Sequence, residues 1–130
     1  MRSFKASAVQ MSAGSDKEAN LAAVAELVTN AAASGASLVA LPEVFAWRGP
    51  QEREPEIAEP LTGRIGTFAS ELARRLGIWL VAGSILETAD NGAAGGRCYN
   101  TTALFSPDGT LAASYRKIHL FDVDVEGRIQ

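Results

Sequence analysis

Cysteine and histidine are scarce in this chain of 130 residues. Cys98 is its single cysteine and His119 its single histidine. An internal disulfide needs a second cysteine, and zinc sites rich in cysteine or histidine need several such ligands at defined spacings. The sequence therefore excludes an internal disulfide and a metal site of this kind.

Long apolar runs and clusters of basic residues are also missing. No stretch reaches the roughly 18 uninterrupted apolar residues of a membrane-spanning helix. Lys5, Ser7 and Gln10 interrupt the apolar residues near the amino terminus, which therefore lack the core of a signal peptide. The net charge of −3 argues against electrostatic binding of nucleic acid or of an anionic membrane. We expect a soluble cytoplasmic protein whose partner is a small molecule or another protein.

Hydrophobic residues make up 47% of the chain, which is enough to bury the core of one domain. Two segments have apolar residues at helical spacing. The first is predicted to begin at a capping box formed by Ser15 and Glu18 and to end at Gly35, and the second to begin at a Thr62 cap and to end at Gly77. The predicted strands around them cover residues 4–11, 37–41 and 78–85. This order predicts parallel strands joined by right-handed crossovers, with 37–41 buried on both faces.

A hairpin is predicted after these units. Segments 99–105 and 111–115 flank Ser106-Pro107-Asp108-Gly109, whose proline and glycine positions favour a type I turn. Together the elements predict an α/β fold with a mixed sheet and two main helices. Two helices can cover one face of such a sheet, so we expect the other face to be apolar and without a partner.

Two charged residues are predicted to lie near each other. Glu43 follows the strand 37–41 and therefore emerges at its carboxyl end, where open α/β sheets place their ligand crevices. Lys117 follows the second strand of the hairpin. The alternative is that both are ordinary solvated side chains, with Arg116 and Lys117 simply ending a strand. We predict that Glu43 and Lys117 approach each other at one end of the sheet.

Two motifs resemble the nitrilase superfamily of carbon–nitrogen hydrolases, most closely its omega-amidase branch. They are Leu38-Val39-Ala40-Leu41-Pro42-Glu43 and Tyr115-Arg116-Lys117-Ile118-His119-Leu120-Phe121-Asp122. Supporting matches are Gly83-Ser84 and Tyr99-Asn100-Thr101, which leads into the Pro107-Asp108-Gly109 turn. The resemblance implies that residues 1–130 form a partial carbon–nitrogen hydrolase domain, the amino-terminal half of an α-β-β-α sandwich.

The resemblance also implies a chemistry. Glu43 matches the general base and Lys117 the catalytic lysine of a Glu-Lys-Cys triad that hydrolyses small-molecule amides through a covalent thioester, without a metal or organic cofactor. The nucleophilic cysteine of the family follows the lysine in a segment that this sequence does not contain. We therefore expect the 130 residues to be truncated before the nucleophile and inactive by themselves. The complete protein is expected to form a homo-oligomer.

Several neighbouring residues have less direct interpretations. Cys98 precedes Lys117 and is interpreted as a structural thiol, and Glu126 as a tail carboxylate. His119 is expected to make a hydrogen bond that anchors the lysine motif. Phe45 and Trp47 either line the mouth of a pocket or pack inside their loop.

Two other classes of function stay open at this point. One is a non-catalytic interaction module that pairs through its open sheet face. The other is a doubly wound anion-binding domain, although Gly92, Gly95 and Gly96 precede a strand, whereas a phosphate-binding loop opens a helix.

Overall fold

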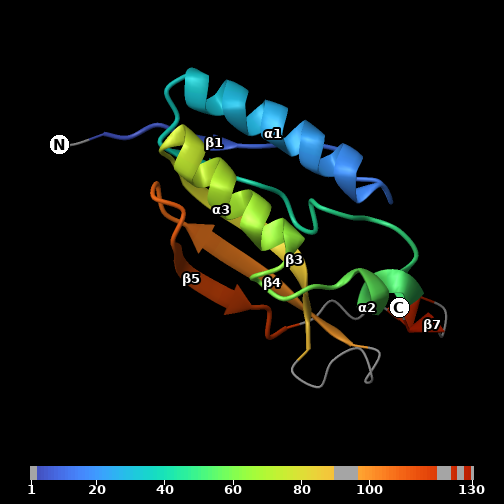
Figure 1. Ribbon diagram of the computed structural model, residues 1–130. Coiled ribbons are helices and arrows are strands. Elements are labelled where there is room, and N and C mark those ends of the chain that lie inside the picture. Colours follow the sequence, from blue (N-terminus) through green and yellow to red (C-terminus); the bar gives the residue numbers. More distant parts are fainter. Residues whose placement is uncertain (1–2, 90–96, 120–123, 126–127, 130) are drawn as a thin grey trace.

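A five-stranded sheet organises the chain in the computed structural model, which describes residues 3–89, 97–119, 124–125 and 128–129 (Figure 1). Its strand order is β1-β2-β3-β4-β5. β1–β2 and β2–β3 are parallel, whereas β3–β4 and β4–β5 are antiparallel. The strands are β1 (Ala6–Ala8), β2 (Leu38–Ala40), β3 (Trp79–Thr88), β4 (Cys98–Phe105) and β5 (Leu111–Arg116), and a separate pair consists of β6 (Asp124–Val125) and β7 (Arg128–Ile129).

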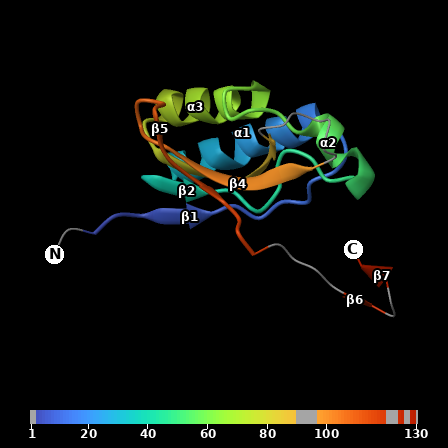
Figure 2. The ribbon, with the colours of Figure 1, turned by 90° about the horizontal axis from the view of Figure 1, so that it is seen from below.

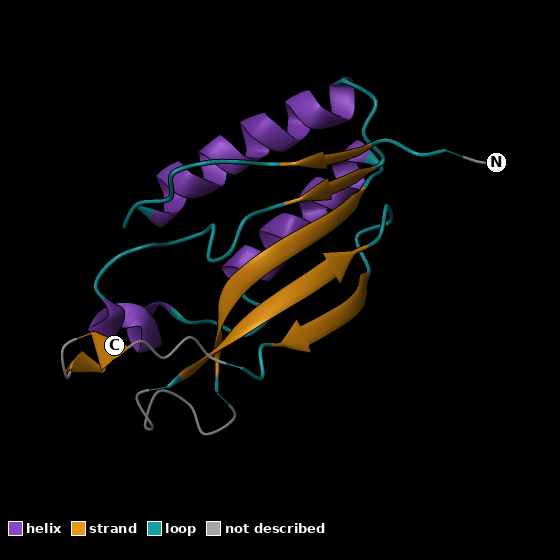
Figure 3. Ribbon diagram, turned by 180° about the vertical axis from the view of Figure 1, so that it is seen from behind, coloured by secondary structure: helices purple, strands orange, loops and turns teal. Residues whose placement is uncertain are grey.

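Two main helices lie on the same face of this sheet. They are α1 (Lys17–Ala33) and α3 (Arg64–Leu76), and Figures 2 and 3 show both on one side of the strands. The connection from β2 to α3 contains the 3-10 turn η1 (Gln51–Arg53) and the single turn α2 (Glu54–Ile57). The predicted α/β fold with a mixed sheet and two main helices is therefore confirmed.

The hairpin and the helix ends follow their local signals. In the β4–β5 turn, the Gly109 N–H donates to the Ser106 carbonyl at 2.8 Å, the hydrogen bond that often closes a four-residue turn. Gly77 ends α3 with a φ of 63°, in the left-handed region that glycine adopts without strain. The predicted hairpin and the predicted end of the second helix at Gly77 are confirmed.

The predicted start of the first helix is wrong by one residue. The N-cap of α1 is Asp16, whose carboxylate accepts the Ala19 N–H at 3.0 Å. Ser15 and Glu18 therefore form no capping box, because Asp16 provides the acceptor that the exposed N–H groups of the first turn need. Glu18 instead forms an ion pair with Arg64 at 2.8 Å.

The start of α3 also differs from its prediction. The N-cap is Gly63, not Thr62, and it has no side chain to accept a hydrogen bond. Glu59 takes this role, because its Oε2 accepts the Ile65 N–H at 2.9 Å. The other oxygen of Glu59 accepts a bond from Lys17 Nζ at 2.7 Å, which connects the starts of the two main helices.

The hydrophobic core fills the layer between the two helices and the sheet. The side chains of this core are almost completely shielded from solvent. Its larger members are Leu21, Val24 and Val28 from α1, Ile65, Ala69 and Leu72 from α3, Val39, Leu80, Ile85 and Phe105 from the sheet, and Phe45 from the β2–α3 connection.

The opposite face of the sheet is open. None of the described helices lies on it (Figure 3). Trp79 is 40% exposed and Tyr115 56% exposed. Leu38 and Ala40 are only half-buried, so the prediction that this strand is buried on both faces is wrong, because none of the described elements forms a layer over its second face. The predicted open apolar face is present in the described part of the chain.

Among the described helices, none combines the length and the apolar character that crossing a membrane would need.

Candidate active site

Glu43 and Lys117 meet beyond the ends of two strands. Lys117 Nζ lies 3.2 Å from Glu43 Oε1, although 74 positions separate the two residues. Both side chains are accessible to solvent, at 51% and 35% of their area. The predicted approach of these residues is observed, while their catalytic roles stay predictions.

The strained backbone after Glu43 is fixed from the neighbouring strand. Val44 has a φ of 52°, a conformation that costs a residue with a branched side chain about 1–3 kcal/mol. Its N–H donates to Ser84 Oγ at 3.3 Å, and Ser84 is buried at a register irregularity of β3. At Gly83 a Cβ atom would lie 3.0 Å from the Leu41 carbonyl oxygen. The Gly83-Ser84 pair therefore has a physical role in shaping the chain around Glu43.

The segment that follows Val44 is held in place by α1. Asn20 on α1 is buried, and its Nδ2 donates to the Ala46 carbonyl at 3.0 Å and to the Gly14 carbonyl at 2.7 Å. Phe45 and Trp47 are both buried in this segment. They pack inside the protein, so the alternative that they line the mouth of a pocket is wrong. Their burial anchors the segment that carries Glu43.

Asn100 on β4 contacts both charged residues. Its Nδ2 donates to Glu43 Oε1 at 2.8 Å, and its backbone carbonyl accepts the Lys117 N–H at 2.9 Å. No role for Asn100 is predicted from the sequence. Its place in the Tyr99-Asn100-Thr101 match is the signal that could have indicated one.

The electrostatics of the site favour an ionised Glu43. The hydrogen bond from Asn100 lowers the pKa of this carboxyl below its usual value, and the hydrogen bond and charge of Lys117 act in the same direction. Burial has a smaller, opposite effect on this pKa. Near neutral pH, Glu43 is therefore an anion that can accept a proton, and it lies beside an ammonium group that can stabilise negative charge.

A second charge pair, formed by Glu87 and Arg116, lies at the end of β5 next to Lys117. Arg116 donates through Nε and Nη2 to the two carboxylate oxygens of Glu87, each at 2.9 Å, and Thr101 Oγ1 adds a bond to Glu87 at 2.7 Å. The guanidinium also lies 4.1 Å from the centre of the Tyr99 ring. The Arg116 bond lowers the pKa of the buried Glu87 carboxyl. This cluster fixes the end of β5 immediately before Lys117.

Cys98 has the environment of a structural thiol. It is half-buried and packs against the small cluster formed by Val44, Trp47 and Leu86. Burial raises the pKa of its thiol, and the negative charge of Glu54 adds to this effect. A raised pKa reduces the thiolate population that nucleophilic attack requires.

The remaining candidates are His119, the three glycines and Glu126. His119 is exposed, and no hydrogen bond to its side chain is observed among the described residues, so the expected anchoring bond is not found. Gly92, Gly95, Gly96 and Glu126 lie outside the described residues. Within the described chain, no cluster of three or more His, Cys, Asp or Glu side chains is arranged to hold a metal ion.

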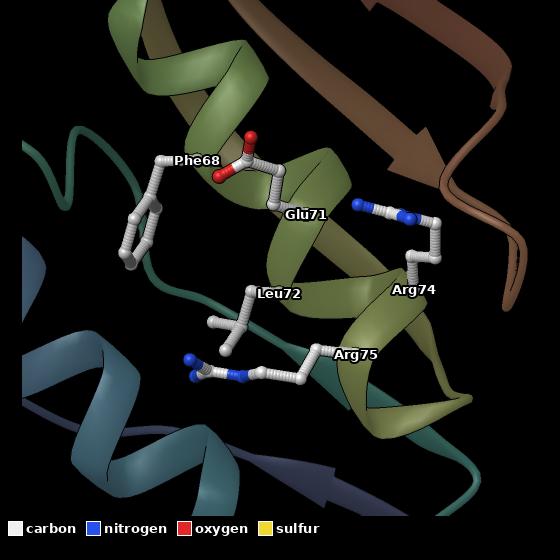
Figure 4. Close-up of a pocket in the computed structure, with 5 residues that line it drawn as sticks. All are labelled: Phe68, Glu71, Leu72, Arg74 and Arg75. Atoms are coloured by element: carbon white, nitrogen blue, oxygen red, sulfur yellow. The ribbon is translucent and has the colours of Figure 1, made fainter.

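A surface pocket occurs elsewhere, on α3. Phe68, Glu71, Leu72, Arg74 and Arg75 line it, and Figure 4 shows these side chains spreading from one helix. None of them belongs to the cluster around Glu43 and Lys117.

The sequence profile of the family described as carbon–nitrogen hydrolase matches residues 5–129. The chain belongs to this family. Omega-amidase NIT2 of Homo sapiens is 42% identical over 129 residues, which are 99% of this chain and 45% of that protein. Omega-amidase NIT2-B of Xenopus laevis is 42% identical over 130 residues, or 100% of this chain and 45% of that protein. This carbon–nitrogen hydrolase chain thus spans about half the length of the curated relatives it matches.

Solved structures of the nitrilase superfamily have the same fold. The NitFhit protein of C. elegans superposes with a TM-score of 0.82 at 29% identity, covering 95% of this chain and 30% of that one. Saccharomyces cerevisiae Nit3, a member of branch 10 of the nitrilase superfamily, gives 0.73 at 31% identity, covering 85% and 42%. The predicted resemblance to carbon–nitrogen hydrolases and their fold is confirmed.

Proposed function

We propose that Glu43 and Lys117 are the general base and the catalytic lysine of an enzyme that hydrolyses the amide of a small molecule. The observation that carries this proposal is the 3.2 Å contact between Lys117 Nζ and Glu43 Oε1 at the ends of β2 and β5. Open α/β sheets bind ligands beyond such strand ends. The omega-amidase names of the curated relatives support an amide as the substrate.

The chemistry needs a nucleophile in addition to these residues. A thiolate attacks the amide carbon, the carboxylate transfers the thiol proton to the leaving amine, and the ammonium stabilises the oxyanion. We propose that the thiol belongs to a segment of the protein outside the 130 residues, because the raised pKa of Cys98 makes it a poor nucleophile. The 130 residues then form a partial domain that is inactive by itself.

The proposal is tested by ammonia release from monoamides of small dicarboxylic acids. The assay compares the 130-residue chain with an extended protein. The extended protein contains the 130 residues together with the proposed further segment, and it has the length of the curated relatives. We expect turnover by the extended protein and none by the 130 residues. An extended protein that releases no ammonia from any such amide contradicts the proposal.

A second candidate function is favoured by the open sheet face. The exposure of Trp79 and Tyr115 suits a non-catalytic module that pairs through this face with another chain. The nucleotide sequence beyond Gln130 distinguishes the two candidate functions. A frame that continues to a cysteine at a strand end favours the enzyme, and a stop codon favours the module.

A further inference from the structure

The two carboxylate oxygens of Glu43 have different surroundings. Asn100 Nδ2 and Lys117 Nζ both reach Oε1, at 2.8 and 3.2 Å. Among the residues that the structure describes, none donates a hydrogen bond to Oε2. One oxygen is thus held by two donors, and the other is free to accept a proton.

Asn100 is itself fixed on both sides. It lies in β4 between β3 and β5 and pairs with Leu86 of β3. Its carbonyl accepts the Lys117 N–H on the other side. The ionised carboxylate of Glu43 can only accept hydrogen bonds, so the amide of Asn100 must present its NH₂ group to it. Asn100 is therefore hydrogen-bonded to both Glu43 and Lys117.

We propose that Asn100 is a positioning residue, whose amide holds Oε1 of Glu43 beside Lys117 and leaves Oε2 as the oxygen that accepts the proton. The inference rests on the proposed function for the source of that proton. There the S–H bond of the attacking thiol breaks, an O–H bond forms at Oε2, and the proton then passes to the leaving amine. The hydrogen bond from Asn100 adds to the stability of the ionised form of Glu43, which is the form that accepts the proton.

The first test follows the Glu43 carboxyl directly by ¹³C NMR in the extended protein, with Glu43→Gln identifying its signal. Asn100→Ala removes the donor, and we expect the pKa of Glu43 to rise by about half to one unit, since the carboxylate is partly exposed. Asn100→Asp keeps the shape of the side chain, replaces the donor with an acceptor and adds a like charge, so it should raise this pKa further. Thr102→Ala, in the same strand and also half-buried, should leave it unchanged.

The second test is the pH profile of kcat/KM for amide hydrolysis. With Asn100→Ala its acidic limb should move upward by the same amount as the Glu43 titration, and with Thr102→Ala it should stay in place. A shifted titration in a protein that releases no ammonia supports the role of Asn100 and contradicts the proposed hydrolysis. Equal Glu43 pKa values in the wild type, Asn100→Ala and Asn100→Asp overturn the inference, whether or not the protein is active.

Discussion

Lys117 Nζ lies 3.2 Å from Glu43 Oε1, and this contact joins two segments that are 74 positions apart. Glu43 follows a short parallel strand, whereas Lys117 follows the edge strand of an antiparallel hairpin. The sheet brings the two strand ends to the same place.

Removing the proton acceptor should slow hydrolysis strongly. In the extended protein, Glu43→Gln keeps the size of the side chain but cannot take a proton, so we expect kcat for ammonia release to fall by about 10²–10⁴-fold. Glu56→Gln is the matched control, because Glu56 is an exposed carboxylate of α2 in the same connection. Full activity of Glu43→Gln would exclude Glu43 as the base.

Removing the ammonium should weaken stabilisation of the oxyanion. We expect Lys117→Ala to lower kcat by about 10²–10³-fold, the usual effect of losing one such group. Lys5→Ala serves as the control, since Lys5 is an exposed lysine that bonds the Ser34 carbonyl. Comparable rates for the two variants would show that Lys117 takes no part in the reaction.

The thiol of Cys98 should be dispensable. Cys98→Ser in the extended protein should release ammonia at nearly the wild-type rate, because burial raises the pKa of this thiol and so disfavours its reactive form. The 130-residue chain is assayed beside it and should be inactive. Turnover by the 130 residues that disappears with Cys98→Ser would make Cys98 the nucleophile and overturn the proposal of an external thiol.

The Glu87–Arg116 pair should stabilise the fold. Its contribution to the free energy of unfolding should be larger near neutral pH than at acidic pH. Glu87→Gln removes the carboxylate charge that Arg116 contacts, and because Arg116 is partly exposed we expect a loss of about 1–3 kcal/mol in the free energy of unfolding, less than for a fully buried pair. The folded-state pKa of Glu87 is lowered. Its contribution is therefore present above the unfolded glutamate pKa of about 4.3 and lost as pH falls through the folded value.

Urea denaturation of the extended protein at several pH values measures this effect. The difference between the wild type and Glu87→Gln should be largest near neutral pH and should shrink on acidification. The exposed Glu56→Gln variant should show almost no difference at any pH. A Glu87→Gln difference that grows on acidification would contradict the assigned direction of the pKa shift.

The open sheet face should make the 130-residue chain associate with itself. Trp79 and Tyr115 expose a large part of their area on a face that no described helix covers. Dynamic light scattering and titration with a hydrophobic dye should show particles larger than a monomer and strong dye binding. Trp79→Gln should reduce both, whereas Leu27→Gln, at an exposed position of α1, should change neither. A monodisperse wild-type chain without dye binding would show that this face does not cause self-association.

The sequence by itself determined the features that depend on nearby residues. The Pro107-Asp108-Gly109 turn and the left-handed end of α3 at Gly77 form as predicted, and a strand forms before Glu43, although it is not buried on both faces. Each is set by the backbone preferences or hydrophobicity of a few consecutive residues, which can be read without knowing the fold. The order of strands and helices, with the resemblance to known enzymes, also predicted that Glu43 and Lys117 converge.

Only the tertiary structure decided which side chains complete these elements. The start of α3 is capped by Glu59, whose position is fixed by an ion pair with Lys17, 42 positions away, and not by the adjacent Thr62. Asn100 reaches Glu43 across 57 positions. Such hydrogen bonds depend on the distance and direction between segments that the sheet brings together. Local propensity contains no information about that geometry, so these partners become visible once the chain is folded.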